Sequence, residues 1–260
     1  MGRPIIDKTG EININCQEQK MKIIRYKNSR EIDVQFEDGY IVNNVDYGNF
    51  KKGAIKNPYF PSVYGVGYFG EGKYKSRENN KKMTKEYKVW FAMMLRCYGT
   101  NNEINSPTYV DCEVCEQWKN FQLFCDWFQS NYYELGNEKM QLDKDILNRG
   151  NQVYEPGKCI FVPQKINALI LKTQGKRGDL PIGVTYYKRN DKYGAQCCHL
   201  GKGKGRYLGL YNTPEEAFKV YKIEKERYIK QVADKYKSKY PQFPQRLYEA
   251  MMNYQVEITD

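Results

Sequence analysis

The chain has 260 residues, of which 42 are Lys or Arg and 31 are Asp or Glu, so its formal charge is +11. This length allows one large domain or two to three small ones, and a hydrophobic content of 40% argues against wholesale disorder. No stretch approaches the ~18 apolar residues of a membrane span, and residues 1–15 lack the apolar run of a signal peptide.

The positive charge favours a polyanionic partner, with nucleic acid as the first candidate and an acidic membrane surface as the second. Ordinary solubility charge on a lysine-rich protein is the alternative explanation. The 8 cysteines are scattered without a dense spacing pattern, which is typical of thiols in a reducing compartment. We therefore expect a cytoplasmic protein with no membrane partner.

Residues 1–68 form the first expected segment. Short runs of alternating apolar residues at 21–26, 31–39 and 40–45 are separated by turn residues, which is typical of a small meander or barrel. We expect a β module resembling a Src-homology-type barrel, with a docking or accessory role. Residues 70–84 are polar and carry five Lys or Arg, so they read either as a solvated linker or as a segment that lies along a phosphate backbone.

The second expected segment spans residues 84–175. Thr84 is placed to cap a helix with an apolar face, and an aromatic-rich helix follows at 118–128. The aromatic residues on one side of each of these two helices are most simply explained as residues of the hydrophobic core. Residues 142–167 then read as strand, turn, strand and the start of a helix.

The third expected segment spans residues 180–260. Three strand-like runs precede a long helix, whose start is marked by a capping box of Thr213 and Glu216 and by Pro214 at the first helical position. This order predicts a three-stranded antiparallel sheet packed on one long helix. The whole chain is thus expected to be a multi-domain α+β protein.

Several short elements of the third segment follow one another at spacings typical of a known family: Gly183-Val184, Tyr193 with Ala195, Tyr207-Leu208-Gly209, and Thr213-Pro214-Glu215-Glu216-Ala217. Through these residues the segment resembles the Apetala/ethylene-response-factor (ERF) DNA-binding domain. It implies a sheet that lies in the major groove of double-stranded DNA, with outward side chains reading bases. Thr185 and Cys198 stand where plant members carry Arg, and an alternative is that the fold is kept for protein interaction alone.

Strand alternation selects the candidate DNA contacts. If Ala195 and Cys197 face the helix, Gln196 and Cys198 face outward, and either Arg206 or Tyr207 takes the contact position on the third strand. Residues 181–212 hold six Lys or Arg and one Asp, which suits contacts with phosphates. The full candidate set is Thr185, Tyr187, Lys188, Arg189, Lys192, Gln196, Cys198, Lys202, Lys204, Arg206 and Tyr207.

Residues 88–170 contain a second set of spaced motifs: Trp90, Arg96-Cys97-Tyr98, Val114-Cys115, Trp118, Phe121, Leu142-Asp143-Lys144-Asp145, Tyr154-Glu155-Pro156, Cys159-Ile160-Phe161-Val162-Pro163 and Asn167. Through these residues the segment resembles phage-borne proteins related to HNH (His-Me finger) endonucleases. The resemblance implies a ββα element with catalytic candidates Asp143, Lys144, Asp145 and Asn167.

In that family an Asp holds a divalent metal and a His activates water. Asp143 is the candidate ligand for magnesium or manganese, and Lys144 stands where the general-base His belongs. The ordinary pKa of Lys is near 10, so Lys144 would instead stabilise a phosphate charge, with Asp145 as second ligand or base. The only histidine of the chain is His199, in the third segment.

The two resemblances together imply a phage or mobile-element protein of a bacterial host cell. It would bind double-stranded DNA, either as an HNH-related, metal-dependent endonuclease or as a non-catalytic DNA-binding protein. A protein–protein module or inhibitor with a tyrosine-rich surface is the further alternative. Cys112 and Cys115 form one C-x-x-C pair, which Cys97 and Cys159 would complete to a zinc site; we favour buried thiols over zinc.

Overall fold

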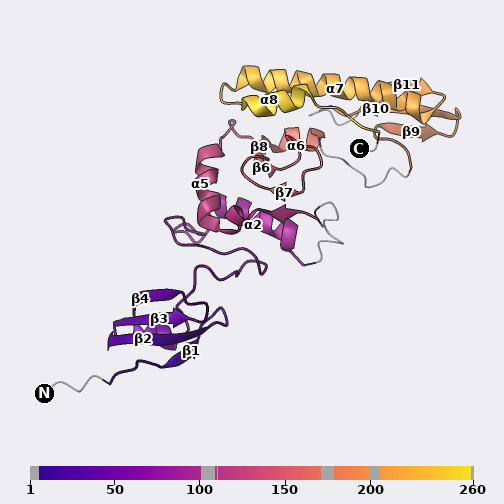
Figure 1. Ribbon diagram of the computed structural model, residues 1–260. Coiled ribbons are helices and arrows are strands. Elements are labelled where there is room, and N and C mark those ends of the chain that lie inside the picture. The colour runs from indigo at the N-terminus through magenta and orange to yellow at the C-terminus, as the bar shows by residue number, and fades with distance from the viewer. Residues whose placement is uncertain (1–5, 101–108, 110, 171–178, 200–204, 259–260) are drawn as a thin grey trace. The chain divides into compact units, whose positions relative to one another are not determined.

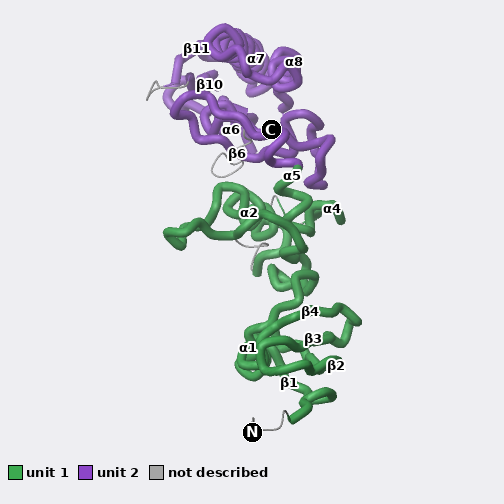
Figure 2. Tube along the Cα trace, turned by 90° about the vertical axis from the view of Figure 1, so that its left-hand side faces the viewer, with its two compact units in different colours: residues 1–126 green, residues 127–260 purple. Residues whose placement is uncertain are grey.

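The computed structural model describes residues 6–100, 109, 111–170, 179–199 and 205–258. The fold is mixed α+β, as the sequence predicts, with several small sheets (Figure 1). The chain divides into two compact units, residues 1–126 and 127–260, and the division falls within helix α5 (Phe121–Asn131) (Figure 2). No helix in the described ranges is both long enough and apolar enough to cross a membrane.

The first unit begins with a four-stranded antiparallel sheet in the order β1-β2-β3-β4. Its strands are β1 (Ile12–Ile14), β2 (Lys20–Asn28), β3 (Glu31–Phe36) and β4 (Ile41–Val45), and the short helix α1 (Tyr47–Lys51) buries Phe50 against it. The expected barrel is wrong. In the described part of the chain β1 and β4 are the two edges of an open meander, and α1 completes the core where further strands would close a barrel.

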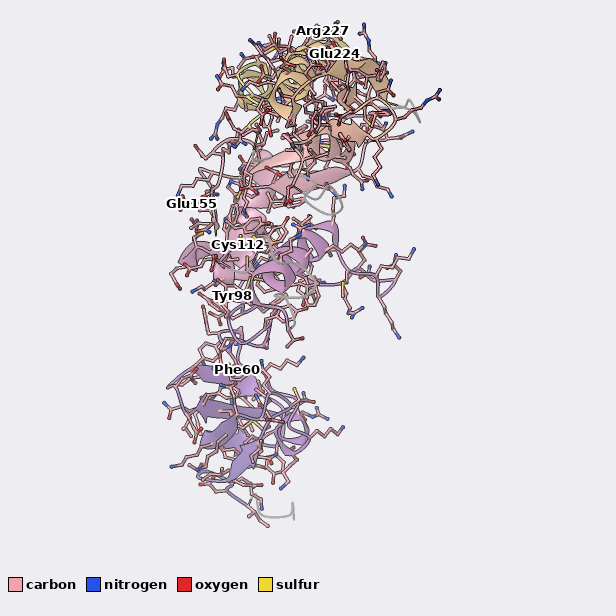
Figure 3. The ribbon with its side chains drawn as sticks, turned by 90° about the vertical axis from the view of Figure 1, so that its right-hand side faces the viewer. Phe60, Tyr98, Cys112, Glu155, Glu224 and Arg227 are labelled. Carbon is pink, nitrogen blue, oxygen red and sulfur yellow. The ribbon has the colours of Figure 1, made fainter. Side chains whose placement is uncertain are left out.

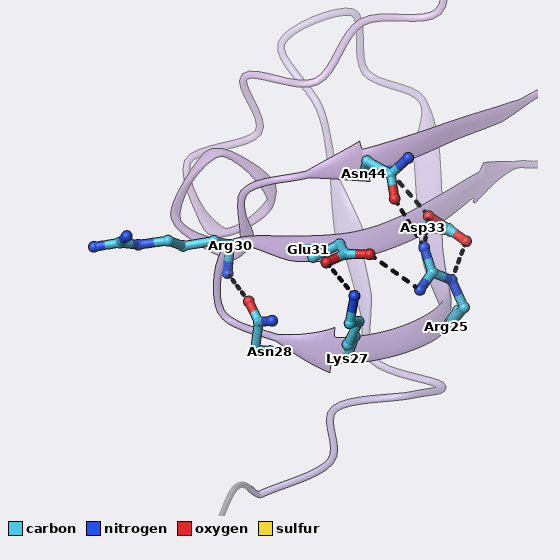
Figure 4. A network of polar contacts seen from close by, with 7 residues as sticks. All are labelled: Arg25, Lys27, Asn28, Arg30, Glu31, Asp33 and Asn44. Atoms are coloured by element: carbon cyan, nitrogen blue, oxygen red, sulfur yellow. Dashed lines mark hydrogen bonds and ion pairs between the residues drawn. The ribbon is translucent and has the colours of Figure 1, made fainter.

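A polar network joins three strands of this sheet (Figure 4). The guanidinium of Arg25 binds both carboxylate oxygens of Asp33, and its Nη2 also donates to Asn44 Oδ1 at 2.9 Å. The backbone N–H of Asn44 donates to Asp33 at 2.9 Å. These hydrogen bonds, with that of Arg25 the largest cause, hold the pKa of Asp33 below its usual value.

The rest of the first unit contains the helices α2 (Lys85–Tyr98) and α4 (Glu116–Lys119) and the short strand β5 (Glu113–Val114). Thr84 caps α2, as predicted, by accepting the Tyr87 N–H. Trp90 is fully buried, and its indole N–H donates to the carbonyl of Trp118 at 2.7 Å. The expected linker is anchored at Tyr74, whose backbone N–H and C=O both bond the Gln122 side chain.

The second unit opens with the predicted strand, turn, strand and helix. Strands β6 (Met140–Asp143) and β8 (Ile160–Pro163) pair in antiparallel register, with β7 (Val153–Tyr154) between them in the chain, and α6 (Gln164–Ile170) follows β8 directly. This element packs on the C-terminal half of α7 (Pro214–Lys239) and on α8 (Gln245–Met252). The shared core consists mainly of Val162, Ile166, Leu169, Ile229, Val232, Ala233, Tyr236, Leu247 and Met251.

The predicted three-stranded antiparallel sheet is confirmed, in the order β11-β10-β9. Its strands are β9 (Val184–Tyr187), β10 (Lys192–Cys197) and β11 (Arg206–Tyr211). The N-terminal half of α7, which begins with the predicted capping box of Thr213 and Glu216, covers one face. Gly183, at φ +77°, permits this packing because a Cβ there would lie 2.1 Å from the ring of Tyr221.

Candidate nucleic-acid interface

The face of the C-terminal sheet that α7 leaves uncovered is set by two buried residues of β10. Ala195 and Cys197 are fully buried in the core with α7, so Gln196 between them points away from the helix. Residues paired directly across antiparallel strands share a face. The pairs Lys192↔Tyr187, Gly194↔Thr185 and Gln196↔Tyr207 therefore define one surface, which we call the outer face: Thr185, Tyr187, Lys192, Gly194, Gln196 and Tyr207.

Two tyrosines dominate this outer face. Tyr207 is 55% exposed and Tyr187 is 38% exposed. A Cβ on Gly194 would lie 2.4 Å from Cε2 of Tyr187, so the ring of Tyr187 lies over the glycine of the neighbouring strand. Exposed aromatic rings held against a rigid sheet can contact bases or sugars with little loss of side-chain entropy.

Gln196 is the amide of the outer face. Its Nε2 donates to the carbonyl of Gly205 at 3.3 Å, and the residue is exposed. A glutamine amide has two N–H donors and a carbonyl acceptor, so this one bond leaves it able to make the two hydrogen bonds that read an adenine.

A β-bulge decides between Arg206 and Tyr207. The register between β10 and β11 shifts between Ala195 and Gln196, which leaves Leu208 without an opposite residue. Because a one-residue shift moves side chains to the other face, Tyr207 opposes Gln196 on the outer face and Arg206 opposes Cys197 on the helix side.

Arg206 is instead held by Glu224 of α7. Glu224 is buried, and its carboxylate lies 3.1 Å from Nη1 of Arg206 and 3.2 Å from Nε2 of His199. Arg227 donates to both of its oxygens, at 2.9 and 2.8 Å (Figure 3). The bond from Arg227 is the main cause that lowers the pKa of Glu224.

Two further candidate cations lie in the turn beside the outer face. Lys188 and Arg189 are exposed in the turn between β9 and β10, where Asp191 accepts a hydrogen bond from the Tyr186 hydroxyl at 2.6 Å. Cys198 is exposed directly after β10. Lys202 and Lys204 lie outside the described residues.

The catalytic candidates lie at the end of β6 and in the turn after it. Asp143 Oδ1 accepts the backbone N–H groups of Asp145 and Ile146 at 2.9 and 2.7 Å, so its carboxylate closes the turn. Burial is the main cause that raises the pKa of Asp143. Lys144 is buried, and its ammonium contacts both oxygens of Asp145 at 3.0 Å and the carbonyl of Asn151 at 2.7 Å.

Asn167 on α6 donates to the side chain of Gln141 at 2.8 Å. Strand alternation places Gln141 and Asp143 on one face of β6, so Asn167 and Asp143 belong to the same side of the element. Magnesium and manganese favour oxygen ligands. Here, however, Asp143 is engaged by two N–H groups and Asp145 by the Lys144 ammonium, so in this arrangement the residues do not fit a divalent cation.

Elsewhere in the described ranges, no three His, Cys, Asp or Glu side chains gather as a metal site would require. Cys112 and Cys159 are buried, whereas Cys97 and Cys115 are partly exposed. The preference for buried thiols over a zinc site stays a prediction.

The chain matches no family model, no curated protein and no solved structure. Both family resemblances therefore stay interpretations of the sequence, and the assignment of function rests on the geometry of the second unit.

Two residues that matter for the outer face were not predicted from the sequence. Gly194 lies within a strand, and a glycine at such a position often marks the close approach of another side chain or backbone. Glu224 stands three residues before Arg227, a spacing at which oppositely charged side chains meet on a helix. Both signals are present in the sequence, but their partners Tyr187 and Arg206 become evident only from the strand register.

Proposed function

We propose that this chain is a double-stranded DNA-binding protein, of the phage or mobile-element type that the resemblances imply, and that the outer face of β9–β11 meets the DNA. One observation carries the proposal: the sheet face left uncovered by α7 combines exposed aromatic, amide and hydroxyl groups with lysine and arginine at its margin. The major groove of DNA admits a β-ribbon, so a small sheet of this kind is a suitable reader.

The residues divide by role. Lys188, Arg189 and Lys192 are placed for phosphates, which supply affinity and make it dependent on salt. Gln196 suits adenine, and Thr185 suits the methyl group of thymine. Arg206 forms an ion pair with Glu224. It therefore contributes positive charge near the sheet but does not read a base.

The test is a salt titration of duplex binding in EDTA. The logarithm of the affinity should fall linearly with the logarithm of salt concentration. The double variant Lys188→Ala/Lys192→Ala should reduce the slope by roughly 0.9 for each phosphate that the protein no longer neutralises. Lys219→Ala/Lys230→Ala, which removes the same charge from exposed positions of α7, is the matched control.

If both double variants reduce the slope equally, the outer face has no special role and only general charge acts. If the protein does not bind duplex DNA, or binds it without salt dependence, the proposal fails and a protein–protein module becomes the leading alternative.

DNA cleavage is a second candidate function. It is favoured by the order of β6, β8 and α6, with Asp143 at the end of the first strand and Asn167 on the helix of the same side. The contacts of Lys144 with Asp145 argue against it. Supercoiled DNA should be incubated with magnesium, manganese or EDTA, with Asp143→Asn as control, because Asn can accept the same backbone hydrogen bonds.

Metal-dependent nicking that Asp143→Asn lacks would establish an endonuclease. Binding without nicking, with DNA from the source of this sequence included among the substrates, would favour a non-catalytic DNA-binding protein.

A further inference from the structure

A groove with a volume of about 480 Å³ runs along the C-terminal half of α7, the half that does not carry the sheet. Its floor includes Tyr228, Tyr236 and Tyr240, which recur at multiples of four residues along one side of the helix. The rings of Tyr236 and Tyr240 have centroids 5.8 Å apart. The volume lies in the range typical of small-molecule sites.

Lysines flank this tyrosine floor. Lys235 and Lys239 are exposed and four residues apart on α7, so they line one edge of the groove, and Lys239 lies over the ring of Tyr240 at 4.9 Å. Lys165 of α6 also lines the groove, and its side chain is 63% exposed. The lining thus carries three ammonium groups.

One carboxylate balances part of this charge. Glu138 is 15% exposed and accepts a hydrogen bond from Lys165 at 2.8 Å. Burial, together with the charge of Glu138 and a hydrogen bond to it, raises the pKa of the Tyr236 phenol to about 12. Lys235 and Lys239 are left as the positive charges best placed to meet an anion.

The lining selects a class of ligand. An inorganic anion would use the lysines and gain nothing from three aromatic rings, whereas an apolar ligand would gain nothing from the lysines. A nucleotide has both a flat aromatic base and a phosphate, and aromatic–cationic grooves suit nucleotides in single strands.

We propose that this groove binds a nucleotide, with its base against the tyrosine floor and its phosphate on Lys235 and Lys239. The inference uses residues different from those of the outer face and does not rest on duplex binding. The nucleotide comes either as a free molecule or as part of a single strand, and the two sources share this chemistry.

Calorimetric titration of the full chain tests the proposal, with adenosine monophosphate, adenosine, inorganic phosphate and a tetranucleotide of deoxyadenosine as probes. Adenosine monophosphate or the tetranucleotide should bind more tightly than phosphate or adenosine alone. Lys235→Ala/Lys239→Ala should weaken that binding at least about tenfold, which corresponds to about 1.4 kcal/mol. Lys219→Ala/Lys230→Ala should leave it unchanged.

Tyr240→Leu should weaken the binding of the nucleotide probes. It should not change the weak binding of inorganic phosphate. A tetranucleotide that binds more tightly than the mononucleotide would support the groove as a single-strand site, and equal affinities would support a free nucleotide as the ligand. The proposal is overturned if neither nucleotide probe binds, if phosphate binds as tightly as they do, or if the lysine variant binds them normally.

Discussion

The ring of Tyr187 lies over Gly194 of the neighbouring strand, so closely that a Cβ on the glycine would be 2.4 Å from Cε2 of the ring. Real Cβ atoms do not tolerate such a distance, because close-packed atoms repel steeply. The glycine therefore fixes where one of the two large aromatic groups of the outer face is placed.

Gly194→Ala should displace the Tyr187 ring and weaken duplex binding while the sheet stays folded. The reason is steric, since Gly194 lies on the face away from α7 and its methyl group would meet the ring and not the core. Fluorescence anisotropy with a labelled duplex measures the affinity, and circular dichroism measures the fold. Gly157→Ala, outside the sheet and at a position where a Cβ meets no atom within 4 Å, is the comparison. Unchanged affinity in Gly194→Ala would show that the position of Tyr187 is irrelevant to binding.

Gln196→Ala should lower the affinity for a preferred duplex by about 1–3 kcal/mol if the amide reads an adenine. It should also relax the preference for adenine at one base pair, because the alanine no longer distinguishes the four bases there. Competition between duplexes that differ at single positions measures both effects. Gln245→Ala, at an exposed position of α8, provides the matched control. An equal loss in the two variants would assign Gln196 no role in recognition.

Asp143→Asn should raise the melting temperature at neutral pH. The pKa of Asp143 is raised in the folded protein, chiefly by burial, so the fold favours the protonated carboxyl and loses stability as the pH rises from about 3.8, its usual value, through the folded pKa. An asparagine Oδ1 accepts the same N–H groups of Asp145 and Ile146 without a charge. Melting curves from pH 3 to pH 8 should show a gain for the variant that disappears toward the acid end. A loss of stability at pH 7 would mean that the negative charge itself supports the turn.

Glu224→Gln should destabilise the second unit by about 1–3 kcal/mol, because Arg206 and Arg227 lose a charged acceptor that is itself buried. The folded pKa of Glu224 lies below 4.5, its usual value, so the stability that its ionised form contributes is present above pH 4.5 and is lost as the pH falls through the folded pKa. The difference in unfolding free energy between the two proteins should therefore be constant near neutral pH and shrink in acid. Denaturant titrations at several pH values measure it, and a difference that does not depend on pH would exclude the ionised carboxylate as its source.

The order of elements in the second unit was predictable because each signal is local. Alternating apolar residues indicated β9 to β11, and the capping box at Thr213 and Glu216 marked the start of α7 within one turn. The choice between Arg206 and Tyr207 was not predictable. It depends on a β-bulge of a single residue, Leu208. The alternation of apolar and polar residues along one strand does not show how that strand is aligned with its neighbour.

The same limit explains the two other differences. The first four strands have the alternation of a barrel, but closure depends on whether distant edges pair, and local pattern carries no information on that. Lys144 stood in the sequence as a charged group next to two aspartates. Its burial, and hence its bond to the carbonyl of Asn151, follows from the path of the turn over eight residues and not from the residues beside it.

Helix α7 has consequences for how this protein can be dissected. Its 26 residues correspond to about 39 Å of helix, and different neighbours cover its two halves. A fragment limited to residues 180–260 would lack Val162, Ile166 and Leu169, which share a core with Ile229 and Val232 of the second half. It would therefore expose part of that core to water, so it should self-associate or unfold. Expression of a well-behaved DNA-binding fragment should therefore require a start upstream of Leu135, so that both halves of α7 keep their neighbours.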